Sequence, residues 1–478
     1  MRVIVLLSAA LLLSGCALGP NYEGPAEVAP RAARSASFAR TGDTPVSTDA
    51  PASTWWQALA DPMLDDLMRR ALAANADVDV ATARLQQARA AARLERANDR
   101  PSVSGSALYA RARLPTIDLG QVLGDREDGS RSDSPSRVDL YSVGFDASWE
   151  IDLFGGRRRA NEAARATAEA AEANLQDVQV TLTADVASAY VNLRDRQHRE
   201  RLMSSAIEMQ QQTIGLTRQR LERGTATQLD VVRLDDQLQG NRAQLQSISA
   251  ERESYLNQIA TLLGEEPGAE DEKLAAPAAT PLPPASVVVG DPAALLRRRP
   301  DIRAAERTLA ADTAKIGQAE AARYPSLKLF GIIGLGGTEP SDLTHLDDFT
   351  AVLAPMLSWN FLDFGRNDAR VGQAEQVRNE AQARYRKTVL DALLDAEDSL
   401  SRFRYGRLTV AARARAKQSA DQAVTLVSQR YQAGTVTLID LLDATRRQVE
   451  AEQNLSQAEA ELTRSFVGIQ KALGLGWS

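Results

Sequence analysis

Two aspartates offer the clearest opportunity for chemistry in this chain. Asp440 and Asp443 lie three residues, or about one helical turn, apart in the segment IDLLDA, and Asp230 holds the matching position in an earlier segment. Carboxylates so close together attract cations, and several chains meeting here would form an acidic ring that holds an opening narrow. The simpler interpretation is that aspartate near a helix N-terminus stabilises the helix dipole. Both interpretations stay open, most evenly for Asp230.

The remaining reactive side chains do not form a site. Cys16 is the only cysteine, so an intrachain disulfide is excluded, and His198 and His345 are isolated. The sequence contains no phosphate-binding loop, zinc motif or catalytic triad signature. We therefore expect a protein that is not an enzyme and that holds neither a metal nor a cofactor. A net charge of −7 also argues against nucleic acid as a partner.

The N-terminus has the pattern of an exported lipoprotein. Residues 1–15 combine a basic start with an apolar stretch too short to span a membrane. Leu13-Ser14-Gly15-Cys16 resembles a bacterial lipobox, which predicts a covalent lipid on Cys16. By analogy with bacterial lipoproteins, Ala17 at the next position favours sorting to the outer membrane, where the chain would contact lipid.

The sequence contains a long internal repeat. The segment Gln219–Val232 recurs as Gln429–Leu442, a shift of 210 residues, with six of 14 positions identical. The same shift maps Ser148-Trp149 onto Ser358-Trp359, so the residues between these places are equal in number in both copies. A repeat of this length indicates a duplicated structural unit.

Each copy predicts a helical hairpin. Apolar residues at a period of about 3.6 predict long helices over roughly 157–222 and 366–432, and return helices over 227–263 and 437–473. Gly224-Thr225 and Gly434-Thr435 end the long helices, since glycine favours a left-handed C-cap and threonine caps helices. Shorter helices, near 77–98 and 301–323, are expected to stack end to end with the return helices.

Each copy also predicts one strand pair, 103–113 with 140–151 and 327–335 with 350–361. These strands approach the ~9–11 residues that cross a bilayer as tilted strands, and the joining loops, 121–137 and 337–348, are polar. Four strands cannot close a membrane barrel, so the chain must oligomerise. We expect a mainly α-helical fold with membrane β-structure, in which three chains build a 12-stranded barrel continuous with a long helical barrel. The predicted segments are a signal peptide (1–15), a lipidated extended segment (16–54), repeat one (55–263), a linker (264–299) and repeat two (300–478).

This combination resembles the outer-membrane factor family of TolC-like channels. The resemblance rests on Trp55-Trp56 with Asp61-Pro62, the two Gly-Thr turns, the repeated Ser-Trp…Phe-Gly junctions and Asp440–Ala444, and the lipobox points to the OprM/NodT-like efflux lipoproteins. It implies a homotrimer in the outer membrane that extends into the periplasm. Such a trimer is the passive duct of a tripartite pump, docked on a periplasmic adaptor and an inner-membrane transporter of the resistance–nodulation–division class.

The resemblance also assigns roles to residues. Asp440 and Asp443 match the family's constriction aspartates, Tyr431 matches a tyrosine that locks the closed state, and Gly224, Thr225, Gly434 and Thr435 form the tips where an adaptor docks. The TolC branch has an arginine where this chain has Val436, so its salt-bridge latch does not carry over. Trp149 and Trp359 fit either an interfacial belt or packing at the junction.

Two other functions compete with efflux. The same fold could serve as the outer-membrane duct of type I protein secretion, which lipidation disfavours without excluding. A structural coiled-coil lipoprotein of the periplasm would need no membrane strands, and the two predicted strand pairs count against it.

Overall fold

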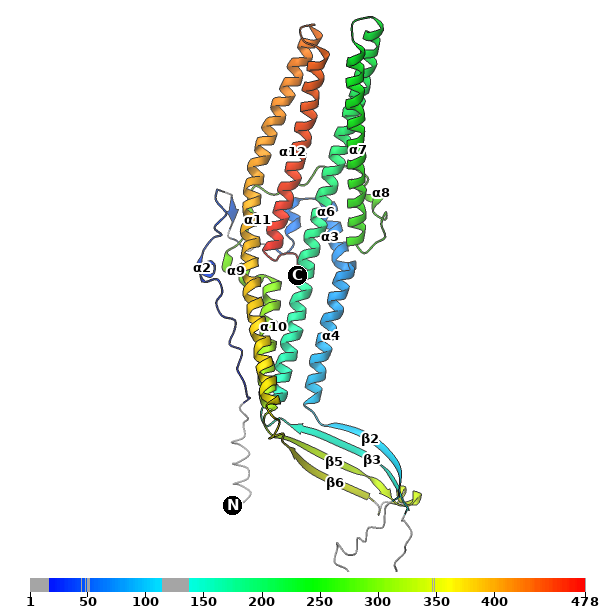
Figure 1. Ribbon diagram of the computed structural model, residues 1–478, viewed down its shortest axis with the longest axis vertical. Helices are drawn as coiled ribbons and strands as arrows, with labels where there is room; N and C mark the ends of the chain where they lie inside the picture. The colour runs from blue at the N-terminus through cyan, green and yellow to red at the C-terminus, as the bar shows by residue number, and fades with distance from the viewer. Residues whose placement is uncertain are drawn as a thin grey trace, which may run out of the picture. The chain divides into compact units, whose positions relative to one another are not determined.

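The computed structural model describes residues 17–43, 45–47, 49, 52–113, 137–345, 347 and 349–477 (Figure 1). The signal segment, Cys16 and most of the polar loop 121–137 lie outside the described residues. The chain divides into two compact units. Unit 1 comprises 1–24, 87–168 and 308–382, and unit 2 comprises 25–86, 169–307 and 383–478.

Unit 1 contains one antiparallel sheet of four strands in the order β2-β3-β5-β6. Its strands are β2 (Ser102–Arg113), β3 (Arg137–Ile151), β5 (Ser326–Gly337) and β6 (Phe349–Ser358), and the short 3-10 helix η2 (Pro340–Leu343) precedes β6. The two hairpins match in register, because Ser102 pairs with Ser148 and Ser326 with Ser358. β3 and β5 pair with each other, so the seam between the repeats is itself a strand ladder. β2 and β6 are edge strands of this sheet.

The fourth strand is shorter than expected. We predicted that it runs to 361, but β6 ends at Ser358. The indole N–H of the next residue, Trp359, donates a hydrogen bond of 3.0 Å to the carbonyl oxygen of Arg323. Because β6 pairs only with β5, which begins at Ser326 opposite Ser358, the residues beyond Ser358 have no partner strand.

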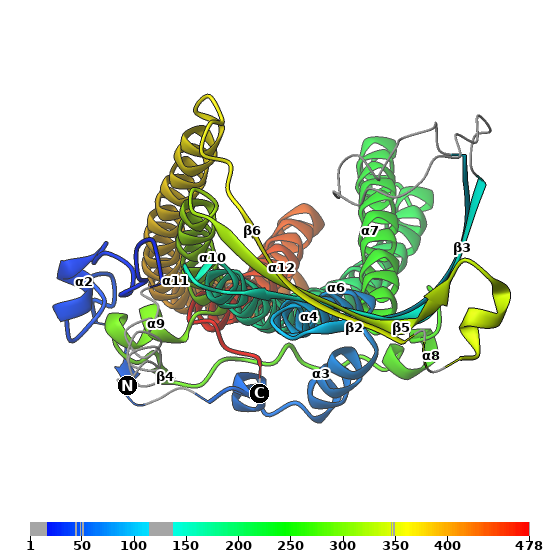
Figure 2. The same cartoon turned by 90° about the horizontal axis from the view of Figure 1, so that it is seen from below.

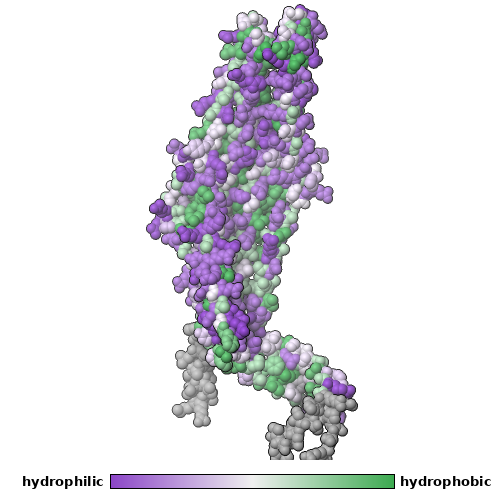
Figure 3. Space-filling view, viewed as in Figure 1, coloured by the Kyte–Doolittle hydropathy of each residue, from purple (hydrophilic) through white to green (hydrophobic). Residues whose placement is uncertain are grey.

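One face of the sheet is apolar. The register places Val143, Phe145, Ile333, Leu335 and Phe349 on the same face, around a shallow groove. Hydrophobic residues cover much of the visible sheet surface (Figure 3). The opposite face carries Ser104, Ser106, Ser142 and Asp146 in copy one, whereas Ile332 and Val352 lie there in copy two. Apolar residues on both faces explain why the alternation is weaker in the second copy.

Long helices follow each strand pair. They are α6 (Gly156–Glu222), α7 (Gln228–Leu262), α11 (Arg366–Gln432) and α12 (Leu438–Ala472). The long helices have 67 residues each and the return helices 35 each, so the duplicated lengths predicted from the repeat are confirmed. Among the described residues, no helix combines the length and apolarity needed to span a membrane.

The shorter helices join the return helices end to end, as expected. They are α4 (Ala76–Asn98) and α10 (Pro300–Ala321), and α3 (Pro62–Ala74) directly precedes α4. Asn75, between α3 and α4, donates from Nδ2 to the carbonyl oxygen of Leu262 at 2.9 Å. Arg299 holds the equivalent place before α10 and donates from Nη1 to the carbonyl oxygen of Ala472 at 3.0 Å. Each joint thus satisfies a carbonyl that the helix end leaves unpaired.

The main hydrophobic core lies in unit 2. Trp55 and Trp56, in the 3-10 helix η1 (Trp55–Leu59), are buried, and the Trp55 ring lies 6.0 Å from that of Phe466 on α12. The Tyr190 hydroxyl donates to Asp61 Oδ2 at 2.7 Å. This core joins the start of the ordered chain to both repeats, which explains why the Trp-Trp pair and the following Asp-Pro begin an ordered element.

The N-terminal segment and the linker lie on one side of the helices of unit 2 (Figure 2). The N-terminal segment includes α2 (Pro30–Arg34) and β1 (Val46–Ser47), and the linker includes α8 (Asp271–Leu274), β4 (Val287–Val288) and α9 (Pro292–Arg298). β1 pairs with β4 in parallel. The segment that we expected to be extended is therefore tied to the linker rather than free.

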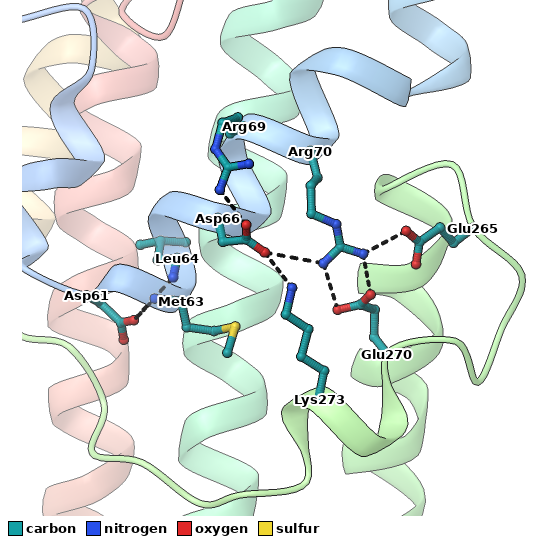
Figure 4. Close-up of polar contacts among 9 residues, drawn as sticks. All are labelled: Asp61, Met63, Leu64, Asp66, Arg69, Arg70, Glu265, Glu270 and Lys273. Carbon is teal, nitrogen blue, oxygen red and sulfur yellow. Dashed lines mark hydrogen bonds and ion pairs between the residues drawn. The ribbon is translucent and has the colours of Figure 1, made fainter.

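A cluster of ion pairs fixes the start of the linker (Figure 4). Arg70 of α3 pairs with Glu265 at 2.6 Å and with Glu270, whose side chain is almost fully buried. Asp66, one turn earlier, pairs with Lys273 at 2.5 Å. The guanidinium of Arg70 holds the pKa of Glu270 below its usual range, and hydrogen bonding to Lys273 lowers the pKa of Asp66. The linker is thus held to the helices by charge as well as by apolar packing.

Candidate functional site

The two hairpin tips have the same backbone conformation. Gly224 and Gly434 both have φ of +73°, which glycine adopts without steric cost. The following residues close the turn, since the Thr225 N–H bonds to the Arg220 carbonyl at 2.8 Å and the Thr435 N–H to the Arg430 carbonyl at 2.9 Å. These left-handed C-caps end the long helices at the residues that the Gly-Thr pairs predicted.

Asp230 and Asp440 cap the return helices. Each forms a capping box: Asp440 Oδ2 accepts from the Thr437 backbone N–H at 2.8 Å and from its hydroxyl at 2.6 Å, and Asp230 makes the same bonds with Thr227. The threonine hydroxyl bond, followed by the backbone bond, lowers the pKa of both carboxyls. Asp440 is exposed and Asp230 is half-buried. Asp230 and Asp440 therefore stabilise their helices within a single chain, and their negative charges remain accessible to solvent.

Asp443 has a different environment. Its carboxylate pairs with Arg446 at 2.7 Å and with Arg447 at 2.9 Å, on the same helix. The bond to Arg446 is the main reason that the pKa of Asp443 lies below its usual range. In copy one the equivalent residue is Arg233, so the two tips carry opposite charges at this position.

Tyr431 contacts the other hairpin. The guanidinium carbon of Arg220, on α6, lies 5.2 Å from the centroid of the Tyr431 ring, on α11. That distance is within the range of a cation–π interaction. Sequence reasoning selected Tyr431 but missed Arg220, because nothing in the sequence pairs an arginine of copy one with a tyrosine of copy two.

A groove of about 620 Å³ separates the two tips. It brings together Tyr431, Asp443, Thr225 and Gly434 with Asp230, all of which were selected from the sequence. Val436, Leu438, Ile439 and Leu442 add an apolar surface, and Arg220, Arg233 and Arg446 add positive charge. Thr435 lies outside the groove lining. Asp440 is likewise absent from the lining, so the two aspartates of IDLLDA do not share one environment.

The strand-to-helix junctions also repeat. The Trp149 indole N–H donates to the Asp99 carbonyl at 2.9 Å, and Trp359 donates to Arg323 at 3.0 Å. These acceptors are equivalent in the two copies, each lying just after the end of a short helix. The packing role that we predicted for both tryptophans is thus present, and the interfacial belt stays a prediction.

The first described residues after Cys16 are held by unit 1. The Leu18 N–H bonds to the Phe154 carbonyl at 3.2 Å, next to the end of β3. Arg159, which is buried, donates to the carbonyl oxygens of Leu18 and Gly19 at 3.0 and 3.1 Å. Cys16 itself lies outside the described residues, and its lipidation stays a prediction.

Comparison with known proteins gives consistent matches along the chain. A family model described as "Outer membrane efflux protein" matches residues 67–265 and 292–475. Nodulation protein T of Rhizobium leguminosarum bv. trifolii is 31% identical, covering 98% of this chain and 96% of that protein. The pyoverdine export outer membrane protein OpmQ of Pseudomonas aeruginosa is 30% identical over 100% of this chain and 97% of its own length. The solved outer-membrane channel OprN superposes with a TM-score of 0.87 at 34% identity, covering 97% of this chain and 100% of that one.

Proposed function

This chain belongs to the outer membrane efflux protein family, and we propose that three copies of it form the gated duct of a tripartite efflux pump. The chain is an outer-membrane efflux protein whose helical part extends into the periplasm, with the fold of the outer-membrane channels.

The sheet carries this proposal. It has an apolar face, and its edge strands β2 and β6 each pair with only one neighbour. Backbone groups at an open edge cannot be satisfied in lipid, so the edges must pair with other copies. Three copies bring 12 strands, within the size range of known barrels, and the lipid proposed on Cys16 would hold each chain at the membrane.

The tips supply the gate. In three copies, Asp440 and Asp443 together place six carboxylates around the periplasmic mouth, and Asp230 adds one more from the first hairpin of each chain. We expect these carboxylates to favour cations at the mouth, although Arg220, Arg233 and Arg446 offset part of their charge. The contact between Arg220 and Tyr431 links the two hairpins of one chain. We propose that it replaces the salt-bridge latch of the TolC branch, which Val436 cannot form because it carries no charge. The tip turns and the apolar side chains beside them are the docking surface for an adaptor, which links the duct to an inner-membrane transporter of the resistance–nodulation–division class.

Small molecules are the cargo that we favour. OpmQ is named for pyoverdine export, and its match covers the whole of this chain. The alternatives are protein secretion through the same duct and a structural periplasmic lipoprotein. Neither the tips nor the sheet favours them over efflux.

Detergent extraction followed by planar-bilayer recording tests the duct. We expect heat-sensitive trimers and a cation-preferring conductance, and we expect that Asp440→Ala with Asp443→Ala raises the single-channel conductance. A soluble monomer without conductance would refute the duct. An unchanged conductance in the double variant would remove the gating role and leave the duct intact.

Acid gives a second test of the gate. The folded-state pKa values of Asp440 and Asp443 are lowered, so their interactions are complete above the unfolded value of about 3.9 and are lost as the pH falls through the lowered values. Cation preference should therefore persist from neutral pH to about pH 4 and be lost only at lower pH, as the carboxylates are protonated. Reversal potentials measured across a salt gradient would show this, and a loss near pH 6 would point to other groups.

A further inference from the structure

A polar groove of about 530 Å³ lies between α11 and α12, well away from the tips. Arg402, Tyr405, Thr409 and Arg413 of α11 line it at spacings of three and four residues, so they share one helix face. Asn454, Gln457 and Ser465 of α12 line the other wall. The volume lies within the range of ~300–1,000 Å³ that is typical of ligand sites.

The groove exists because the two copies differ here. In copy one, these positions hold Val191, Met203 and Ile248, all of which are buried, and Met203 and Ile248 belong to the apolar cluster between α6 and α7. Copy two has Ser401, Arg413 and Ala458 in these places, and all three line the groove. Replacing large apolar side chains with small or charged ones turns a packed helix seam into an open one.

The charge in the groove is not neutralised. Arg402 and Arg413 are exposed, and neither forms an ion pair with any residue that the structure describes. Glu461, the carboxylate of the groove, is held by Arg464 of its own helix. Arg404 lies outside the groove lining, with its guanidinium 4.7 Å from the centroid of the Tyr405 ring.

The groove opens away from the linker. Thr463 of α12 donates to the carbonyl oxygen of Pro281 in the linker at 2.8 Å. Glu461 and Ser465 are each two residues from Thr463, which is about 200° around the helix. In a trimer with the linkers on its outer surface, the groove therefore faces the interior of the duct.

We propose that this groove is a binding subsite for anionic aromatic compounds on their way through the duct, an assignment that rests on the proposed function. Arg402 and Arg413 are 11 residues apart, or about 16 Å along the helix, which suits a molecule with negative groups at separate positions. Guanidinium groups bind carboxylates, sulfonates and phosphates through paired hydrogen bonds, and the Tyr405 ring offers a surface for stacking. Asn454, Gln457 and Thr409 offer hydrogen bonds to the polar substituents of such a molecule.

Block of single channels by naphthalene-1,5-disulfonate tests the subsite in the full-length reconstituted protein. We expect that Arg402→Gln with Arg413→Gln weakens the block about tenfold or more, since two charge-assisted contacts are lost, while conductance in high salt stays close to that of the parent. Arg415→Gln is the matched control, because Arg415 is an exposed arginine of the same helix that bonds to the Ala411 carbonyl outside the groove. An equal block in the parent and the double variant would overturn the proposal.

Chemical access is the second measurement. Cys16 is the only natural cysteine, so Thr409→Cys places one thiol in the groove that an anionic methanethiosulfonate reagent can modify. We expect modification to lower the conductance, and faster modification with Arg402 and Arg413 present than with both replaced by glutamine. A thiol that does not react in conducting channels would show that another copy covers the groove, which would overturn the subsite. Loss of all conductance in the parent protein would instead refute the duct.

Discussion

The two helical hairpins share their lengths and their turns but not their seams. Near the tip of the first hairpin, α6 and α7 enclose a cluster of Met203, Ile207, Ile214, Leu234, Leu238 and Ile248. The second hairpin has no buried residue across the fully described stretch 404–452. Arg413, Lys417 and Gln448 stand at the positions of Met203, Ile207 and Leu238. The two hairpins therefore share their backbone arrangement, but only the first has a buried apolar cluster between its helices.

This difference between the helix seams indicates that one hairpin is held in place while the other can move. An apolar seam holds two helices in one arrangement, whereas a polar and exposed seam lets them shift at little cost. Asp443 and Tyr431 both belong to the second hairpin, and Arg233 and Arg220 belong to the first. We infer that the first hairpin is the fixed side of the gate and the second the moving side. Distances between spin labels on the two tips in closed and opened channels would decide this.

Exchanging seam residues should have the largest effect. Leu238→Gln places the copy-two residue in the buried seam of copy one and should lower the free energy of unfolding by about 3 kcal/mol. The reverse change, Gln448→Leu, fills no buried site and should alter stability by less than about 1 kcal/mol. Urea unfolding of the detergent-solubilised protein measures both. Equal losses would contradict the contrast between the seams.

Removing the side chains at the joints between helices should have the second-largest effect on stability. Arg299 is largely buried and pairs with Asp301 and Asp395, so Arg299→Ala should cost about 2–3 kcal/mol by leaving these groups unpaired. Asn75→Ala removes a neutral hydrogen bond and a helix cap, and it should cost about 1–2 kcal/mol. Thermal unfolding midpoints would rank the two variants. A larger loss for Asn75 would show that the neutral joint is the stronger one.

The junction tryptophans should behave alike. Trp149→Phe and Trp359→Phe each remove one indole hydrogen bond, worth about 0.5–1.5 kcal/mol, and leave an aromatic ring. The heat stability of the assembled protein should fall by the same amount in both variants. Unequal losses would assign one tryptophan a further contact, such as the membrane interface.

The smallest effect is expected at the tip contact. Tyr431→Leu gives copy two the residue that copy one has at Leu221 and removes a cation–π contact worth about 0.5–1 kcal/mol. The opening frequency of single channels should rise several-fold, while Tyr431→Phe, which keeps the ring, should change it little. Equal opening in the parent and the leucine variant would exclude Arg220–Tyr431 as a latch.

The helices, their ends and the strand pairing followed from local patterns. The 3.6-residue period and the Gly-Thr turns predicted α6, α7, α11 and α12 to within one residue, because caps and periodicity are properties of neighbouring residues. The early end of β6 could not be foreseen, since it depends on the place of β6 at the sheet edge, where its only neighbour β5 begins at Ser326, the partner of Ser358.

Contacts between distant segments escaped prediction for the same reason. Arg70 meets Glu270 across 200 residues, and Arg220 meets Tyr431 on a different hairpin. The polar groove did leave a signal, because aligning the copies sets Met203 against Arg413 and Ile248 against Ala458. That signal indicates an open seam only once the structure shows that the copy-one residues are buried.

The matched lengths of α6 and α11 also limit which changes in length the chain tolerates. Deleting one residue within a helix shortens it by about 1.5 Å and rotates every later side chain by about 100°. Such a deletion in α6 alone would turn Met203 and Ile207 out of their seam and set the first tip out of step with the second. Insertions and deletions should therefore survive only where the copies already differ in length, as they do by 14 residues between Ser102 and Ser148 and their counterparts Ser326 and Ser358.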